Sequence, residues 1–373
     1  MELVVSDETL RDGEQQVGVN FSAANKILLA KEILSIGVDH IDTMPAISKH
    51  EERVVTKLSS LFPDKVYAAT MMGKEYIDHA SLLGVRNIIL FSSLSDRLLK
   101  LKGMSREQNV KKVRKCCRYA RKKGMNIIFA GEDSTRADND YTVSFIRDIE
   151  KYIEGFLLCD TVGVLTSKSA ARLVRSVLGN VNCDIGTHFH NDRGMADKNT
   201  VTAVESGANI VSGTFGGIGE RAGNADLCKV LLSLKKNGVA SDKINYSALR
   251  QLKKTVYRLG GSRPAKPYSA RAFWHESGIH VHALLKDRLS YNSFLPEKYD
   301  RTNRFFFGKF SGVSGYRYLL GEKYSDRQLS VIRDRIKELA QEEGKSYSEE
   351  EARNLAKEVI RNQKEVAVAS VIT

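Results

Sequence analysis

The sequence lacks an uninterrupted apolar run of about 18 residues, the least that a membrane-spanning helix requires. Its first residues, M-E-L-V-V-S-D-E, also lack the basic patch, apolar stretch and cleavage site of a secretory signal. The five cysteines are odd in number and contain no C-x-x-C spacing. These absences predict a cytoplasmic protein with reduced thiols and no membrane span.

Nucleic-acid-binding motifs are also missing, although the net charge is +13. No zinc finger, aromatic RNA-binding pattern or helix-turn-helix accompanies the basic residues, which are spread along the chain. The densest run, at 111–123, places Val113, Cys117 and Ala120 at helical spacing, so its charges fit the solvated face of a helix. We therefore predict no nucleic-acid partner, and we interpret the positive potential as an attraction for anionic substrates.

What the sequence does contain is an alternation of short apolar runs and longer amphipathic ones over its first two-thirds. We expect strands at 3–9, 40–44, 66–71, 87–92, 126–131, 155–160, 184–190 and 209–214. Helix-like stretches lie between them, at 24–36, 51–61, 75–83, 106–123, 141–151, 167–178 and 195–206. Eight strands alternating with helices over about 240 residues predict an α/β fold of the (β/α)8 TIM-barrel type. An open doubly wound sheet would show the same alternation.

The pattern changes after Lys235, and this change sets the expected domain boundaries. We expect a catalytic barrel over 1–260, which would end in a helix at 246–259. A linker and lid segment would follow over 261–289, and a mostly helical C-terminal subdomain over 290–373. From residue 325 onward the chain is charged, and its apolar residues recur at the spacing of one buried helix face.

Two histidines stand two residues apart in G-T-H-F-H-N-D, residues 186–192. Alternate side chains of a strand point to the same side, so His188 and His190 present both imidazoles to one face. Imidazoles in this arrangement can bind one metal ion, but taken alone they can equally be ordinary core or surface residues.

Further polar groups follow other predicted strands, and in such barrels the catalytic groups gather at the carboxyl ends of the strands. Arg11 and Asp12 follow the first strand, Glu132 follows the fifth and Thr161 the sixth. Asp12 would add one oxygen ligand to the two imidazole nitrogens and leave positions open for a substrate. Taken alone, Arg11 and Asp12 would form only a salt bridge at a helix start.

A glycine-rich loop, G-G-I-G-E-R-A-G-N at 216–224, follows the eighth predicted strand. Its glycines allow close backbone approach, and its last residue, Asn224, can reach a metal ion or its water. A glycine-rich loop without other evidence is often merely a turn.

Together these motifs resemble those of the 2-oxoacid/acetyl-CoA Claisen-condensing enzymes, which include isopropylmalate, citramalate and homocitrate synthases. The stretches that carry the resemblance are T-L-R-D-G-E-Q, H-F-H-N-D, G-I-G-E-R-A-G-N, E-S-G-I-H-V-H-A-L-L-K-D-R-L-S-Y and F-G-K-F-S-G. They extend over nearly the whole chain. The short C-terminus, E-D-S-T-R-A-D and G-I-H-V-x-x-L-L-K are most similar to the nitrogen-fixation type of homocitrate synthase.

The resemblance implies a role for each of nine residues. It implies that Asp12, His188 and His190 bind a divalent metal ion (Mg, Mn, Zn or Fe), with Asn224 nearby. It implies that Arg11 stabilises the developing enolate or alkoxide and that Glu132 and Thr161 line the oxo-acid pocket. It also implies that His280 carries protons, with Tyr291 as its companion and Glu132 assisting. In dimers of this family the segment with His280 often reaches the neighbouring subunit's barrel. We therefore expect a homodimer.

The resemblance implies that acetyl-CoA is condensed with a 2-oxo acid, and 2-oxoglutarate is the first expectation. Lysine-pathway homocitrate synthases carry an arginine four residues before the strand-five glutamate, and here that position is Ile128. Position 130, often serine, is Ala130. An apolar oxo acid, as in isopropylmalate or citramalate synthesis, or a specialised oxo acid therefore stays open. Arg97, Lys100 and Lys102 either supply a cation instead or form a solvent-exposed basic loop.

Three other classes of function are less well supported. A metal-dependent lyase or aldolase on the same barrel does not account for His280 and Tyr291 in a long C-terminal extension. A non-catalytic binding protein does not account for the complete set of ligands. H-E-S-G-I-H at 275–280 resembles the zinc-protease H-E-x-x-H but is one residue too long, and two histidines five apart do not share a helical face.

Overall fold

A computed structural model describes the backbone of residues 2–372 and the side chains of residues 2–362. Eight parallel strands close into a barrel in sequence order, with β8 paired to β1. They are β1 (Val4–Asp7), β2 (His40–Thr43), β3 (Val66–Thr70), β4 (Asn87–Ser93), β5 (Asn126–Glu132), β6 (Gly155–Asp160), β7 (Asp184–Phe189) and β8 (Ile210–Gly213). Each begins and ends within two residues of its expected range. The predicted (β/α)8 barrel is therefore confirmed, and the open sheet is excluded.

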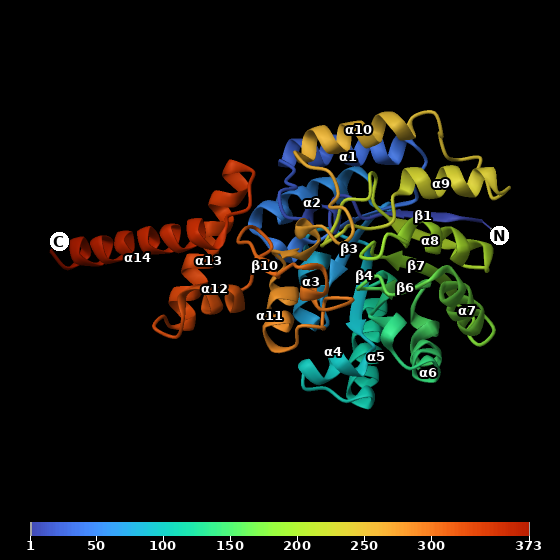
Figure 1. The fold of residues 1–373 in the computed structure, drawn as a ribbon, viewed down its shortest axis with the longest axis horizontal. Helices are drawn as coiled ribbons and strands as arrows, with labels where there is room; N and C mark the ends of the chain where they lie inside the picture. Colours follow the sequence, from blue (N-terminus) through green and yellow to red (C-terminus); the bar gives the residue numbers. More distant parts are fainter. Residues whose placement is uncertain (1, 373) are drawn as a thin grey trace.

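Helices cover the outside of this barrel (Figure 1). They are α1 (Ala23–Ser35), α2 (Lys49–Leu61), α3 (Lys74–Leu82), α4 (Asp96–Leu101), α5 (Arg106–Lys122), α6 (Asn139–Ile149), α7 (Ser167–Leu178), α8 (Ala196–Glu205), α9 (Leu227–Lys236) and α10 (Leu249–Gly260). A capping box of Ser105 and Gln108 starts α5, whose buried face includes Val113, Cys117 and Ala120 as expected. The last helix starts three residues later than expected, at Leu249.

The barrel interior is a packed apolar layer. Tyr67, Ile89, Ile128, Leu157, Cys159 and Ile210 form a buried cluster there. The burial of each large apolar side chain stabilises the fold by about 1.5–3 kcal/mol. This layer closes the interior below the carboxyl ends of the strands, so a site at those ends opens to one side only.

The C-terminal part lies to one side of the barrel, and α14 projects away from it (Figure 1). Its elements are β9 (Trp274–His275), α11 (Gly278–Lys286), β10 (Arg304–Phe305), α12 (Val313–Leu320), α13 (Asp326–Glu343) and α14 (Glu349–Ile372). Its own buried cluster includes Ile332 and Ile336 of α13, together with Val281 and Leu284 of α11. Among the residues described, no helix is both long and apolar enough to cross a membrane.

Candidate functional site

Asp12, His188 and His190 meet at the carboxyl end of the barrel. The Nε2 atoms of His188 and His190 lie 3.6 and 3.9 Å from Asp12 Oδ2. One ligand atom from each residue lies within 4.8 Å of the other two, and all three residues are buried. Metal–ligand bonds of about 2 Å hold neighbouring ligand atoms about 3–4 Å apart. The distances from Asp12 to both imidazoles lie in this range, so the three predicted ligands are candidates for holding one divalent ion.

The surroundings of the two imidazoles favour metal binding. His188 Nδ1 lies 3.0 Å from Ser212 Oγ, and this hydroxyl donates to Glu8 Oε1 at 2.9 Å. The contact fixes the ring so that Nε2 is the nitrogen facing Asp12. Burial lowers the pKa of His190 well below its ordinary value, which keeps this imidazole neutral and able to act as a ligand.

Asp12 is held as a carboxylate. Its burial would raise its pKa, but His190, Arg11 and His188 together bring that pKa well below the ordinary value. Asn224 Nδ2 donates to Asp12 Oδ1 at 2.6 Å, and Asn224 Oδ1 is buried without a hydrogen-bond partner. The backbone of Gly219 passes so close, with a φ of +149°, that a Cβ atom would stand 2.1 Å from Asn224 Nδ2. The glycine of this motif therefore makes room for the Asn224–Asp12 contact.

Three carboxylates surround the guanidinium of Arg11. Its Nε donates to Asp42 at 2.6 Å, its Nη1 to Asp12 at 2.9 Å, and its Nη2 to Glu8. Burial would lower the pKa of Arg11, but Glu8, Asp42 and Asp12 outweigh it and raise the pKa well above the ordinary value. The sequence argument missed Glu8 and Asp42. The signal for both was an acidic residue at the carboxyl end of a buried strand.

Glu132 is an ionised carboxylate with three donors. Ser93 Oγ and the Tyr291 hydroxyl donate to it, and Lys102 Nζ lies 2.9 Å away. Burial opposes ionisation, but Lys102, Ser93 and Tyr291 lower the pKa of Glu132 to about 2. Thr161, also expected here, lines the same pocket and accepts a hydrogen bond from Asp133 N at 2.8 Å.

His280 and Tyr291 close the site from above. Their rings stack with centroids 3.8 Å apart at 22°. His280 Nδ1 lies 3.4 Å from Glu220 Oε1, and Glu220 belongs to the glycine-rich loop after β8. The structure therefore brings the predicted pair together on the chain's own barrel.

His275 also approaches Glu220, which the sequence argument did not anticipate. Ligand atoms of Glu220, His275 and His280 lie within 4.8 Å of one another. The two histidines meet because His275 belongs to strand β9 and only His280 to a helix. Glu276 instead accepts a hydrogen bond from Ser346 Oγ at 2.5 Å. A zinc-protease motif would place this glutamate beside the two histidines, and here it is separate from them.

A buried cluster of charges fixes the C-terminal part to the barrel. Lys309, from F-G-K-F-S-G, pairs with Glu14 and lies 3.6 Å from Glu51 Oε1. Lys26 Nζ binds the same two carboxylates, at 2.5 and 2.6 Å. All four side chains are almost fully buried, and their charges balance. This cluster joins the motif with Lys309 to η1 (Gly13–Gln15), directly after Asp12.

The central pocket has a volume of about 110 Å³. Its apolar lining includes Met44, Ala69, Ile89, Phe91 and Ala130. Its polar lining includes the predicted residues Arg11, Asp12, Glu132, Thr161, His188, His190 and His280. Among the described residues that line it, Arg11 is the one lysine or arginine.

A closed (β/α)8 barrel that gathers one carboxylate and two imidazoles at its carboxyl end is a barrel protein with a candidate metal centre. Residues 2–256 match the family described as HMGL-like, and residues 268–344 match the homocitrate synthase post-HMGL domain-like family. The chain belongs to the HMGL-like family.

Three relatives illustrate the range of activities among similar chains. The 2-isopropylmalate synthase of Sulfurisphaera tokodaii is 34% identical over 351 residues, 90% of either chain. The (R)-citramalate synthase CimA of Methanocaldococcus jannaschii is 35% identical over 90% of this chain and 70% of its own length. The homocitrate synthase AksA of Methanothermobacter thermautotrophicus is 32% identical over 91% of this chain and 88% of its own.

Solved structures share the fold at lower identity. The HMG-CoA lyase of Brucella melitensis superposes with a TM-score of 0.62 at 18% identity, covering 70% of this chain and 99% of the lyase. This likeness supports the barrel assignment alone.

Proposed function

We propose that this protein is an acyltransferase that condenses acetyl-CoA with a 2-oxo acid and hydrolyses the thioester. The observation that carries the proposal is the convergence of Asp12, His188 and His190 in a pocket that His280 also lines. The names of the similar synthases support it, since isopropylmalate, citramalate and homocitrate synthases catalyse this type of condensation.

Asp12, His188 and His190 would hold a divalent metal ion, with Asn224 beside it. The fit rests on the donor set of two nitrogens and one oxygen, and on the unpartnered Asn224 Oδ1. When bound, such an ion supplies Lewis-acid polarisation of a ketone and a hold on the neighbouring carboxylate. This donor set is compatible with Mg, Mn, Zn or Fe.

The residues of the chain account for the proton movements. His280 accepts a proton from the acetyl methyl group, and the resulting carbon nucleophile forms a bond to the ketone carbon of the oxo acid. The positive charge of Arg11 stabilises the oxygen that becomes an alkoxide. The proton that His280 accepted then passes to this alkoxide, giving a hydroxyl. Water attacks the thioester carbonyl, so that CoA leaves as a thiol, a new carboxylate remains and one proton is released to solvent. Tyr291 holds His280 in place by stacking on its ring, and the Tyr291 hydroxyl donates a hydrogen bond to Glu132.

The pocket wall favours a 2-oxo acid with a short apolar side chain over 2-oxoglutarate. A second carboxylate would need a cation of its own, but Arg11 already contacts three carboxylates and, in this proposal, its remaining attraction serves the alkoxide oxygen. Lys102 is held by Glu132 and does not line the pocket. Met44, Ile89 and Phe91 offer apolar contact instead. This argument supports the isopropylmalate-type and citramalate-type alternatives.

A thiol-release assay with acetyl-CoA tests the function. The panel is 2-oxoisovalerate, pyruvate, 2-oxoglutarate and oxaloacetate, each with Mg²⁺, Mn²⁺ or Zn²⁺. We expect turnover of 2-oxoisovalerate or pyruvate with a kcat/KM at least about tenfold above that of 2-oxoglutarate, as the loss of an apolar fit would cause. Thiol release from none of the four would refute the synthase. Metal-dependent cleavage of a hydroxyacyl-CoA instead would favour a lyase.

A further inference from the structure

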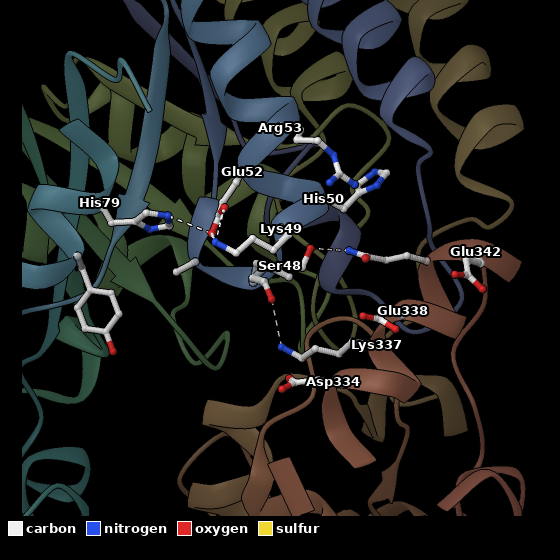
Figure 2. Close-up of a pocket in the computed structure, with 14 residues that line it drawn as sticks. Ser48, Lys49, His50, Glu52, Arg53, His79, Asp334, Lys337, Glu338 and Glu342 are labelled. Atoms are coloured by element: carbon white, nitrogen blue, oxygen red, sulfur yellow. Dashed lines mark hydrogen bonds and ion pairs between the residues drawn. The ribbon is translucent and has the colours of Figure 1, made fainter. Parts of the chain in front are cut away.

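A groove of about 900 Å³ lies between the barrel and the C-terminal part, with α2 and α3 on one side and α13 on the other (Figure 2). Its titratable lining residues are Lys49, His50, Glu52, Arg53, Tyr76, His79, Asp334, Lys337, Glu338 and Glu342. Lys49, Arg53 and the three acids of α13 are exposed, whereas Lys337 is half-buried. One lysine of this groove therefore has surroundings that differ from those of an ordinary surface lysine.

Lys337 crosses the groove from α13 to the barrel. Its Nζ donates to the backbone oxygen of Ile47, which ends η2 (Pro45–Ile47), at 3.2 Å. Figure 2 shows the side chain reaching toward the barrel between Asp334 and Glu338 of its own helix. The amine is therefore held in one place, at the interface of the two parts, by a neutral carbonyl oxygen.

The acids beside this amine do not pair with it. Those of α13 pair with arginines of the same helix, as Asp334 does with Arg333 at 2.7 Å. Among the side chains that the structure describes, no carboxylate lies within ion-pair distance of Lys337 Nζ. Burial and the positive charge of Arg333 lower the pKa of Lys337 to about 8, and Asp334 and Glu276 offset only part of this effect. A buried amine of this kind is partly neutral, and therefore nucleophilic, near neutral pH.

We propose that Lys337 is a covalent modification site, at which the amine takes the acyl group of a small neutral thioester. The groove gives the acyl group space, and its four carboxylates against three permanent cations favour a neutral donor over a polyanion. Because the amine gives one N–H to Ile47, its lone pair is free to face the groove. The lone pair attacks the thioester carbonyl carbon, a C–N bond forms and the C–S bond breaks. The thiolate leaves and takes up the proton that the nitrogen loses. The step needs no turnover at the central pocket, so it is independent of the proposed function.

The test incubates the full-length protein with S-acetyl-N-acetylcysteamine and follows the acetylation of each lysine by peptide mass spectrometry. The reference lysines are Lys49, whose side chain is 85% exposed in the same groove, and Lys111, which is exposed on α5. At about pH 7.5, a pKa of about 8 in place of 10.5 raises the neutral fraction of the amine roughly two hundredfold. We expect the initial rate at Lys337 to exceed that at either reference by at least about tenfold, since partial burial and lower basicity offset part of this gain. The rate at Lys337 should level off above about pH 9, while the rates at Lys49 and Lys111 still rise.

An Arg333→Gln variant tests how the amine is kept partly neutral. Loss of this charge also frees Asp334 to pair with Lys337, so we expect acetylation at Lys337 to slow about threefold at pH 7.5 while Lys49 is unchanged. Arg327→Gln, in the exposed first turn of α13, is the control and should change neither rate. Acetylation of Lys337 no faster than that of Lys49 would overturn the inference, since the groove would then merely concentrate the thioester. A rate at Lys337 that keeps rising with pH as the reference rates do would overturn it as well.

Discussion

The phenol hydroxyl of Tyr291 donates a hydrogen bond to Glu132, joining two residues that are 159 positions apart. Glu132 ends strand β5, and Tyr291 belongs to the segment after α11. Since the Tyr291 ring also stacks on His280, the contact sets where the proposed proton acceptor lies relative to the barrel. The barrel and the segment above it therefore form one site.

Replacement of Tyr291 by Phe keeps the stacking but removes this hydrogen bond. We expect kcat for thiol release to fall about tenfold to a hundredfold, because His280 loses part of its positioning. The pKa of Glu132, about 2 with all its donors, rises when one donor is lost. Because that pKa starts near 2, Glu132 stays ionised at neutral pH in the variant, so the fall of kcat there reports lost positioning and not a change of charge.

A Tyr318→Phe variant serves as the control, since Tyr318 is exposed on α12. It should leave kcat unchanged. A Tyr291→Phe enzyme with the wild-type kcat would show that the hydrogen bond to Glu132 has no part in positioning His280.

Replacement of Asp12 by Ala removes the oxygen ligand of the candidate metal centre. We expect the variant to lose bound metal and more than about a hundredfold of kcat, since Lewis-acid stabilisation contributes several kcal/mol. Elemental analysis of the purified protein measures the first effect, and the thiol-release assay the second. A chelator should abolish wild-type activity, and added divalent metal should restore it. Asp64→Ala, an exposed acid, is the control. Full metal content in Asp12→Ala would contradict the assignment.

The fold could be predicted because the strands of a parallel barrel follow one another around the barrel in the same order as in the sequence. Each strand is a short apolar run followed by a helix, and strands that are neighbours in sequence are neighbours in space. The convergence of Asp12, His188 and His190 could be predicted for a related reason. All strands of such a barrel point the same way, so residues after β1 and at the end of β7 must meet at one end, however far apart they are in sequence.

The contacts that the sequence did not reveal depend on burial between distant elements. Glu14 and Glu51 are ordinary helix-start acids in sequence, and only their packing against Lys309 makes them part of a buried cluster. His275 was set aside on helical spacing, but it lies in a strand and reaches Glu220 beside His280. Periodicity describes one element at a time and carries no information about such pairs.

Replacement of Lys309 by Met tests the buried cluster. Loss of one cation leaves Glu14 and Glu51 with Lys26 as their remaining ion-pair partner. We expect the free energy of unfolding, measured by urea denaturation, to fall by about 3–5 kcal/mol, as when one partner of a buried ion pair is removed. Lys111→Met, on the exposed face of α5, should change it by less than about 0.5 kcal/mol. Equal stability of the two variants would mean that the cluster does not fix the C-terminal part.

Co-expression of two inactive chains tests whether His280 closes the barrel of its own chain or the barrel of a partner subunit. One chain carries Asp12→Ala and the other His280→Ala. The structure places His280 over its own chain's pocket, so every site in a mixed dimer lacks either the metal ligand or the proton acceptor. We therefore expect no recovery of thiol release. If the segment were instead exchanged between subunits, random pairing would restore one site in each mixed dimer, about a quarter of wild-type activity. Recovery near that level would show that the closing segment comes from the partner, and sedimentation of the same sample reports whether dimers form.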